Sequence, residues 1–589
     1  MSIVGVMLAG SASAATILIV DDDLACPGAT FSTIGSAVDA AGDGDTIRVC
    51  AGLYIETVSD QGKGLTLLGP QADVIPSDFP APGGEAVIDG QSGDPVVQLG
   101  SGTTLNGFTV QDGKRGIIAG SGATVRSNSF KVLATGLQVF SNVVVADNLI
   151  QADTVGVRVD PSGADDTKVS GNAFRGSFSS AAIDESGGSG DDDPVMNLSV
   201  TGNTYAAPAG GGAFLEATHT VGLKITGNTL DGPGAVSELI GLDPSDHDWT
   251  VSGNRISNAG GDGVVVACSF GAGDTMGGGS VTQNLFSNIV TAIEWGNGGG
   301  SCDGDFEIHS NVFPASDGTF DPHKAAVFDP TASNVHLENN YWGCNLGPGQ
   351  GKCSYSIGSD TGDNRYLVLL SAIGTKTLSV GQSTPFTASL NHNNLGETVA
   401  LPVLDGTPIF FSSSTYLSVT PGVGTFTGGT ATAVVKAKQP PGTAGIGGQS
   451  VSGVLESATT TQNGITIKAS SPPPPPPPAL PALTVHDAST TEGKSGTHVM
   501  YFSVTLSKKY TKAVTVKFAT GNGTAKAPTD YVAKTGTLTF PAGVTSKAIG
   551  ITIKGDKIKE PNETFVVTIY APVNAKIADP NALGVIRNS

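Results

Sequence analysis

Acidic side chains are the first candidates for chemistry in this 589-residue chain. One stretch reads Asp243-Pro-Ser-Asp246-His247-Asp248-Trp249. Carboxylates beside an imidazole can hold a metal ion, and the same side chains could line a sugar groove. An exposed loop without a ligand is the alternative, and we favour it. A second run, Asp191-Asp192-Asp193, follows Gly and Ser residues and predicts a solvent-exposed loop.

Charge is distributed unevenly along the chain. Residues 483–589 contain thirteen Lys and Arg against seven Asp and Glu, a net charge of +6. Residues 1–482 contain eighteen basic and forty-five acidic residues, a net charge of −27. This acidity argues against binding nucleic acid or an acidic polysaccharide through the larger part unless cations bridge the two. The basic segment, residues 483–589, could instead bind to an anionic cell envelope.

A motif that returns nine times must position these side chains. It consists of an aliphatic residue, two variable residues, Asn, one more residue and a large apolar residue. Consecutive Asn residues lie 20 to 31 positions apart, and a period in this range indicates a repeat architecture. The nine residues are Asn128, Asn148, Asn172, Asn203, Asn228, Asn254, Asn284, Asn311 and Asn340.

Each repeat predicts a strand, a bend and another strand, because apolar and polar residues alternate and the Asn interrupts the alternation. Asn suits the bend because it tolerates the left-handed backbone region and its amide can bond nearby backbone groups. If every rung bends at the same place, the Asn side chains stack about 4.8 Å apart and bond one another. We therefore predict a right-handed parallel β-helix in which these Asn residues form a ladder rather than bind a ligand.

The start of the predicted β-helix carries a cap, which a solenoid needs because its end rungs would otherwise expose core. Ile34, Ala37, Val38 and Ala41 recur at helical spacing. They predict a short amphipathic helix over the first rung.

Two stretches resemble known β-helix proteins. Residues 31–56, from Phe-Ser-Thr-Ile-Gly to Leu-Tyr-Ile-Glu, resemble the opening of pectin-lyase-like proteins, pectinesterases included. Residues 339–349, Asn-Asn-Tyr-Trp-Gly-Cys-Asn-Leu-Gly-Pro-Gly, resemble the closing motif of secreted bacterial β-helix proteins. The resemblance spans about residues 17–355 and implies the fold.

The same resemblance implies no particular reaction. The Asp-Phe-Ile-Phe-Gly and Arg-Pro-Trp runs of pectinesterases are absent, as are the Asn-Thr-Asp and Gly-His-Gly runs of polygalacturonases. Lyases of this fold need a basic residue beside an acidic calcium cluster, and basic residues are scarce here. No catalytic residue can be named from motifs.

The first residues indicate export. Residues 2–14 are small or apolar and end in Ala12-Ser13-Ala14, so we expect a signal peptide over 1–14. Its basic opening is missing, which suggests a truncated signal; a buried first strand is the alternative. No later stretch reaches the eighteen or so apolar residues of a membrane span. We expect a secreted or cell-surface bacterial protein without a transmembrane segment.

The six cysteines fit this compartment. An even count in an exported chain favours disulfides, and no Cys-x-x-Cys spacing suggests zinc. Fifteen pairings are possible, but three loops are local and lie where a staple would help. We expect the pairs Cys26–Cys50, Cys268–Cys302 and Cys344–Cys353.

The chain after the β-helix divides into further segments. Strand alternation in Pro408–Ser412 and Ala431–Ala437 predicts a β-sandwich, which resembles bacterial immunoglobulin-like surface domains. Seven prolines, Pro472–Pro478, predict a stiff polyproline II spacer of roughly 22 Å. The expected domains are a β-helix over 15–358, an immunoglobulin-like sandwich over 359–468, a polyproline linker over 469–482 and a last domain over 483–589.

The last domain resembles Calx-beta domains. The likeness rests on Thr491-Glu-Gly493, Gly523-Thr-Ala525 through Tyr531, Gly536 through Gly543, and Gly555-Asp556 through Phe565. The family implies a seven-stranded antiparallel sandwich. Many members bind calcium at one end of it through carboxylates.

A calcium site is the cofactor that this resemblance implies. By motif position its ligands would be Glu492, Asp530, Asp556, Glu560 and Glu563. The chain departs from the family where Lys557 replaces an acid and where the end, Asn588-Ser589, replaces paired Asp. Fewer carboxylates weaken calcium binding, and the Lys557 ammonium could neutralise one carboxylate in place of the ion. Solvated or structural turn acids are the alternative.

Together these features predict an all-β protein: a right-handed parallel β-helix followed by two β-sandwich domains, immunoglobulin-like and Calx-beta. We expect the β-helix to bind a glycan or another partner, or to serve adhesion. A polysaccharide lyase or glycoside hydrolase of the β-helix type is the alternative, and a structural surface stalk is a further one. A face that holds converging carboxylates plus Arg or Lys would favour the enzyme. The sequence indicates neither the ligand nor the oligomeric state.

Overall fold

The computed structural model divides the chain into two compact units, Met1–Ser470 and Ser471–Ser589. The structure describes residues 15–588 except 78–83, 162–163, 186–193, 207–210, 233–235, 244, 268–277, 296–304, 314–323, 328–334, 343–344, 346–354, 358–364, 439–445, 456–457, 460–462 and 469–478. The expected signal peptide and most of the expected polyproline linker therefore lie outside the described residues. In the described part no helix is long and apolar enough to cross a membrane.

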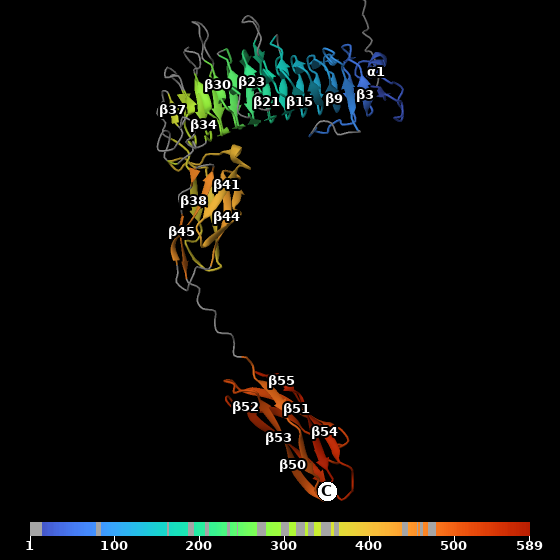
Figure 1. Cartoon of the computed structure of the whole chain (residues 1–589), viewed down its shortest axis with the longest axis vertical. Helices are drawn as coiled ribbons and strands as arrows, with labels where there is room; N and C mark the ends of the chain where they lie inside the picture. Colours follow the sequence, from blue (N-terminus) through green and yellow to red (C-terminus); the bar gives the residue numbers. More distant parts are fainter. Residues whose placement is uncertain are drawn as a thin grey trace, which may run out of the picture. The chain divides into compact units, whose positions relative to one another are not determined.

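The larger part of the first unit is a parallel β-helix with three sheets, A, B and C (Figure 1). Sheet A contains β1 (Ile17–Val20), β2 (Thr46–Val49), β5 (Thr66–Leu68), β8 (Thr104–Asn106), β11 (Thr124–Arg126), β14 (Val144–Ala146), β17 (Lys168–Ser170), β21 (Ser199–Thr201), β25 (Lys224–Thr226), β28 (Trp249–Ser252), β31 (Gly279–Thr282), β34 (Phe306–His309) and β36 (Val335–His336). Sheet B contains β3 (Gly52–Ile55), β6 (Ala86–Asp89), β9 (Phe108–Gln111), β12 (Ser129–Val132), β15 (Leu149–Ala152), β18 (Ala173–Phe174), β22 (Thr204–Ala206), β26 (Thr229–Asp231), β29 (Arg255–Ser257) and β32 (Leu285–Ser287). Sheet C contains β4 (Val58–Ser59), β7 (Val97–Leu99), β10 (Arg115–Ala119), β13 (Thr135–Val139), β16 (Val155–Val159), β19 (Ala181–Asp184), β23 (Ala213–Ala217), β27 (Glu238–Leu242), β30 (Asp262–Val266), β33 (Thr291–Trp295), β35 (Lys324–Val327) and β37 (Tyr355–Ile357). A short extra pair joins β20 (Val195–Met196) to β24 (Thr220–Val221).

Each repeat supplies one rung of this stack. In the first seven repeats the aliphatic residue lies in sheet A, the Asn at the bend, and the large apolar residue in sheet B. In one such rung Val145, Ile150 and Val157 come from sheets A, B and C, and all three are fully buried. Burying a side chain of this size contributes about 1.5–3 kcal/mol, and stacked rungs extend the core continuously.

The predicted Asn ladder is confirmed. All nine Asn side chains are at most 1% exposed. From Asn128 to Asn311, the backbone N–H of each Asn donates to Oδ1 of the Asn in the next rung, over 2.8–3.0 Å. The Nδ2 group of each donates to the same oxygen over 2.9–3.2 Å. Nδ2 also donates to the carbonyl of the preceding rung's aliphatic residue, as from Asn254 to Ile225 over 2.9 Å.

The expected reason for Asn at the bend is wrong in one respect. The residue before each Asn, and not the Asn, adopts the left-handed backbone: φ is +55° at Ser127, +57° at Asp147 and +66° at Gly253. None of the nine Asn residues is among the described residues with positive φ. The preceding residue makes the turn, and Asn is required because its amide supplies both a donor and an acceptor inside the bend.

A helix and a disulfide close the amino end. The predicted helix is confirmed as α1 (Ile34–Ala40), whose residues Ile34, Ala37 and Val38 are buried. The Glu56 carboxylate accepts the N–H groups of Ile34 and Gly35, which the first turn of a helix leaves free.

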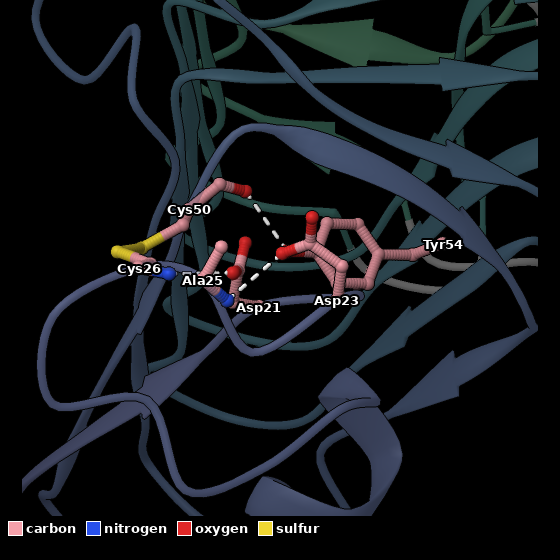
Figure 2. Close-up of a disulfide and its surroundings, with 6 residues drawn as sticks. All are labelled: Asp21, Asp23, Ala25, Cys26, Cys50 and Tyr54. Carbon is pink, nitrogen blue, oxygen red and sulfur yellow. Dashed lines mark hydrogen bonds between the residues drawn. A yellow bond between two sulfur atoms is a disulfide. The ribbon is translucent and has the colours of Figure 1, made fainter.

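The predicted disulfide between Cys26 and Cys50 is confirmed, with Cα atoms 6.5 Å apart. Figure 2 shows it beside Tyr54, whose hydroxyl donates to the Cys50 carbonyl over 2.9 Å, and beside Asp21, which accepts the Cys26 N–H over 2.7 Å. Burial raises the pKa of Tyr54, and so do the nearby charges of Asp22 and Asp21. The pairs Cys268–Cys302 and Cys344–Cys353 lie outside the described residues and stay predictions.

A two-sheet β-sandwich follows the β-helix within the first unit. One sheet has the order β38 (Leu370–Ile373), β40 (Ser383–Ser389), β44 (Thr430–Ala437), β42 (Leu417–Thr420). The other has the order β39 (Thr377–Ser379), β47 (Asn463–Lys468), β45 (Ile446–Leu455), β41 (Pro408–Ser413), β43 (Val423–Thr425), and β46 (Ala458–Thr459) pairs with β45. A 3-10 turn, η1 (Pro402–Leu404), precedes β41.

The sandwich packs on a column of residues that follow the Asn of the last rungs. Leu285, Val312 and Tyr341 pair in register, and Val312 and Tyr341 are 3% and 2% exposed. Val312 and Tyr341 belong to the apolar cluster that contains the sandwich core, and partly buried Leu285 packs against it. One rung earlier, Arg255 Nη1 donates to Thr407 Oγ1 over 2.7 Å. The outward position of the repeat thus becomes a docking surface at this end of the β-helix.

The second unit is another two-sheet sandwich (Figure 1). Its sheets have the orders β53 (Ser546–Gly555), β50 (Gly496–Leu506), β48 (Ala482–Val485), β55 (Lys576–Asp579) and β49 (Ala488–Thr491), β56 (Asn581–Arg587), β54 (Glu563–Val573), β51 (Val514–Asn522), β52 (Thr535–Phe540). The expected seven antiparallel strands are wrong in detail. The described residues form nine segments, because the first and the last strand each divide between the two sheets: β48 pairs in parallel with β55, and β49 with β56.

Replacing Asn254 by Leu should lower the free energy of unfolding of the β-helix by about 1–3 kcal/mol, because the donors and acceptors around it stay buried without partners. Thr229→Leu is the control, since Thr229 is exposed beside the ladder. Urea denaturation of both variants measures the difference. An Asn254→Leu loss no larger than that of the control would contradict a stabilising ladder.

Candidate functional site

Three of the five predicted calcium ligands meet in the second unit. Asp530 lies between β51 and β52, Glu560 between β53 and β54, and Glu563 opens β54. Carboxylate oxygens of the three residues all lie within 4.8 Å of one another, and each residue is half-buried. Oxygen ligands from several loops are the kind of set that calcium takes.

Aromatic packing and backbone bonds hold two of these acids in place. Tyr531 follows Asp530, is 1% exposed, and stacks on Phe565 with ring centroids 4.4 Å apart. Phe565 in turn belongs to the strand that Glu563 opens. Asp530 Oδ2 accepts the Lys526 N–H over 2.6 Å.

The other two predicted ligands lie around this group. Glu492 is 8% exposed, and its backbone N–H donates to the Arg587 carbonyl over 2.7 Å. Burial raises the pKa of Glu492, and the charges of Asp556 and Glu560 raise it further. Asp556 is exposed and accepts the Ile558 N–H over 2.6 Å.

The group carries unbalanced negative charge. Burial raises the pKa of Glu563 to about 7, and the charges of Asp530 and Glu560 add to the shift. Among the described residues, no ion pair joins Lys557 to any of the five acids. Such a group takes up either a proton or a cation.

The acidic stretch 243–249 of the β-helix is not the exposed loop that we favoured. Asp246 is fully buried and accepts the Thr220 N–H over 2.7 Å and the Asp243 N–H over 2.8 Å. Trp249 is 1% exposed. The loop closes on the previous rung, because Asp246 satisfies backbone donors there. The other run, residues 191–193, lies outside the described part of the chain.

Carboxylates and one Arg converge on the outer face of sheet C, where no motif pointed. Arg158, Asp184 and Glu216 are register partners on β16, β19 and β23. Arg158 Nη2 lies 2.8 Å from Asp184 Oδ2, and Asp184 is 1% exposed. Burial raises the pKa of Glu216 to about 7, and the charge of Glu238 raises it further. We name Arg158, Asp184, Glu216 and Glu238 the carboxylate face.

A glycine makes room for this arrangement. A Cβ atom at Gly241, the next register partner, would collide with Glu216 Oε2. The carboxylate face could not be recognised in the sequence, because its residues are separated from the Asn of their rungs by different numbers of positions. Arg158 and Glu238 come ten positions after their Asn, Asp184 twelve and Glu216 thirteen.

One further acidic group, Asp21, Asp22 and Asp23, has ligand atoms within 4.8 Å of one another. Each of the three is engaged with the backbone. They accept the N–H groups of Cys26, Leu53 and Ala25, respectively, over 2.7, 3.0 and 2.9 Å. This group therefore acts as part of the amino-terminal cap.

Comparisons with known proteins identify the second unit. No curated protein matches the chain. Among solved structures, the chain is similar to the apo form of the Calx CBD1 domain (24% identity, 19% of this chain and 99% of that chain, TM-score 0.17) and to the calcium binding domain CBD12 of CALX1.1 (26% identity, 18% of this chain and 45% of that chain, TM-score 0.17). It is also similar to a tailspike protein double mutant of E. coli bacteriophage HK620 (12% identity, 70% of this chain and 77% of that chain, TM-score 0.28). Residues 483–586 match the Calx-beta domain family, so this part of the chain is a Calx-beta domain.

Proposed function

We propose that the protein is a secreted or cell-surface binding protein whose Calx-beta domain takes up calcium. The observation that carries this proposal is the approach of the Asp530, Glu560 and Glu563 carboxylates to within 4.8 Å of one another. Among the described residues, no Lys, Arg or His nitrogen forms an ion pair with any of the three. Bringing three carboxylates together is costly unless a cation or a proton compensates the repulsion.

The expected ligand set is smaller than the resemblance implies. Asp530, Glu560 and Glu563 would coordinate the ion directly, and buried Glu492 would add negative charge beside them. Asp556 lies exposed with one oxygen engaged by a backbone N–H. Calcium affinity falls with the number of ligating charges, so we expect a site that works at extracellular rather than cytosolic calcium concentrations.

The β-helix is the part that we assign to recognition of a glycan. Its long outer faces are polar, and residues 1–482 carry a net charge of −27. Such a surface repels anionic polysaccharides and admits neutral or amino-sugar chains. The Cys26–Cys50 disulfide supports an oxidising compartment for this surface.

The carboxylate face favours hydrolysis of a glycan as a second candidate function. Its residues match the converging carboxylates with an Arg that would distinguish an enzyme from a plain binding surface. Burial raises the pKa of Glu216 to about 7, and the charge of Glu238 adds to the shift, so Glu216 can hold a proton near neutral pH. Glu216 could then protonate a glycosidic oxygen, with Glu238 as the carboxylate that accepts a proton from water. Arg158 covers Asp184 and would orient the substrate.

Calcium should stabilise the Calx-beta domain. The expected gain is about 2.7 kcal/mol when free calcium is a hundredfold above its dissociation constant. Calorimetry of the full chain with millimolar calcium and with chelator measures the shift of that domain's transition. Asp530→Asn should remove most of the shift, whereas Asp579→Asn, an exposed acid outside the group, should keep it. Identical melts in calcium and chelator would refute the site.

Without calcium, the stability of this domain should fall as the pH rises. The pKa of Glu563 is about 7 in the folded domain against 4.5 ordinarily, so the folded state holds a proton that the unfolded state has released between these values. The contribution is complete below pH 4.5 and is lost as the pH rises through 7. Because Glu563 is half-buried, we expect only a fraction of the about 1.4 kcal/mol per pKa unit. Melts in chelator at several pH values should show a shallower slope for Glu563→Gln than for the parent; equal slopes would be the contrary result.

A screen of neutral and amino-sugar glycans should identify ligands of the β-helix, and anionic glycans should not bind. If a ligand is also cleaved, Glu216→Gln and Glu238→Gln should each slow cleavage by about 100-fold or more while binding persists. Glu307→Gln, on the outer face of sheet A, is the control. Cleavage at the parental rate in both variants would leave the β-helix a binding surface only.

A further inference from the structure

Two acidic side chains of the β-helix are enclosed where three successive rungs meet. Glu185 directly follows β19, and its backbone N–H donates to the Glu216 carbonyl over 2.9 Å. Asp246 lies in the loop between β27 and β28. Glu185 is 1% exposed and Asp246 is fully buried. Neither belongs to the carboxylate face or to the calcium group.

Glu185 is only half satisfied by its surroundings. Its Oε2 atom accepts the Thr218 N–H over 2.8 Å and the His219 N–H over 3.2 Å. Its Oε1 atom is buried without a hydrogen-bond partner. A buried carboxylate oxygen in that position is costly as a charged acceptor.

Asp246 binds the same segment from the other side. Oδ1 accepts the N–H and the hydroxyl of Thr220 over 2.7 and 2.8 Å, and Oδ2 accepts the Asp243 N–H over 2.8 Å. The two acids therefore hold residues 218–220 between them. The charge of Glu185 also acts on Asp246, so each ionised group disfavours the other.

The neighbouring titratable groups do not remove this charge. They are Asp184 and Glu216 on the strands of sheet C, His219 in the held segment, and Asp243, His247 and Asp248 in the loop. The charge of His219 acts to lower the pKa of Glu185, but burial has the larger effect and raises it. In the described part of the molecule, no Lys, Arg or His nitrogen forms an ion pair with Glu185 or Asp246. Neither acid belongs to a group of three metal-ligating side chains found there. A proton is the remaining way to neutralise the pair.

We propose that Glu185 and Asp246 form a proton-dependent clasp, which holds residues 218–220 together with Asp243 and residues 245–248 in acidic medium and loosens as the pair ionises. Burial raises the pKa of both groups, that of Asp246 to about 7. Because the ordinary pKa of an Asp is 3.8, the clasp is fully stabilising below that value, and its stabilisation is lost as the pH rises through about 7. The Glu185 N–H bond to the Glu216 strand places this clasp beside the carboxylate face.

Hydrogen exchange of the full chain tests the clasp. The amides to follow are those of Thr218, Thr220 and Asp243, each of which donates to one of the two carboxylates. After correction for the intrinsic exchange rate, their protection should fall about tenfold or more between pH 5.5 and pH 8.5, because each linked proton changes the opening equilibrium by up to tenfold per pH unit. Amides of the Asn ladder, such as that of Asn228, should change little.

Variants separate the clasp from general loosening. Glu185→Gln keeps an acceptor for Thr218 and His219 and removes one charge, so the fall in protection should shrink to about threefold or less. Glu185→Gln combined with Asp246→Asn should abolish it. Asp248→Asn is the matched control in the same loop, where φ is +54° and Asn fits, and it should behave like the parent.

Two results would overturn the clasp. The first is a fall in protection that is equally large in the parent and in Glu185→Gln, or absent from both. The second is full protection at pH 8.5 once calcium or magnesium is added, because the pair would then be a cation site. If the double variant fails to fold, the clasp is still tested by comparing the pH-dependent loss of protection in Glu185→Gln with that in Asp248→Asn.

Discussion

The fold depends on satisfying the polar backbone groups that every rung buries at its bend. A buried N–H or carbonyl without a partner costs about as much as a lost hydrogen bond. The stacked Asn amides meet this requirement, since each side chain accepts an N–H and donates to a carbonyl of the preceding rung, as Asn254 does with Asn228 and Ile225. One corner of the β-helix is thereby fixed. Differences in rung length, from 20 to 31 residues, must be absorbed at the other two corners.

This division of labour leaves other positions free to vary. The residue after each Asn faces outward and makes no ladder bond, so its type follows its surroundings: exposed Thr229 in mid-stack, and Leu285 where the sandwich packs. Sheet C varies in the same way, and there the free positions hold the carboxylate face. Recognition can therefore change on these faces without disturbing the bonds that hold the stack together.

Sequence reasoning succeeded where structure is local and periodic. The ladder and α1 follow from spacing, and the calcium group follows from a family motif that matches over residues 483–586. It failed where a side chain depends on chain closure. From the sequence, Asp246 is an acidic residue of an exposed loop, but in the structure it is buried and accepts backbone N–H groups that close this loop. Glu216 has the sequence context of an ordinary strand residue. Its partners come from rungs of unequal length, so no fixed spacing could have revealed the carboxylate face.

The packing of the sandwich on the last rungs bears on where the chain can be divided. Leu285, Val312 and Tyr341 are covered by the sandwich cluster, and a β-helix cut off near residue 358 would present them to water as one contiguous apolar strip. Such a strip, flanked by paired β-strands, invites self-association. The β-helix therefore needs the sandwich to cover this strip, and the two form one compact unit. A shortened protein should keep both and end after residue 470.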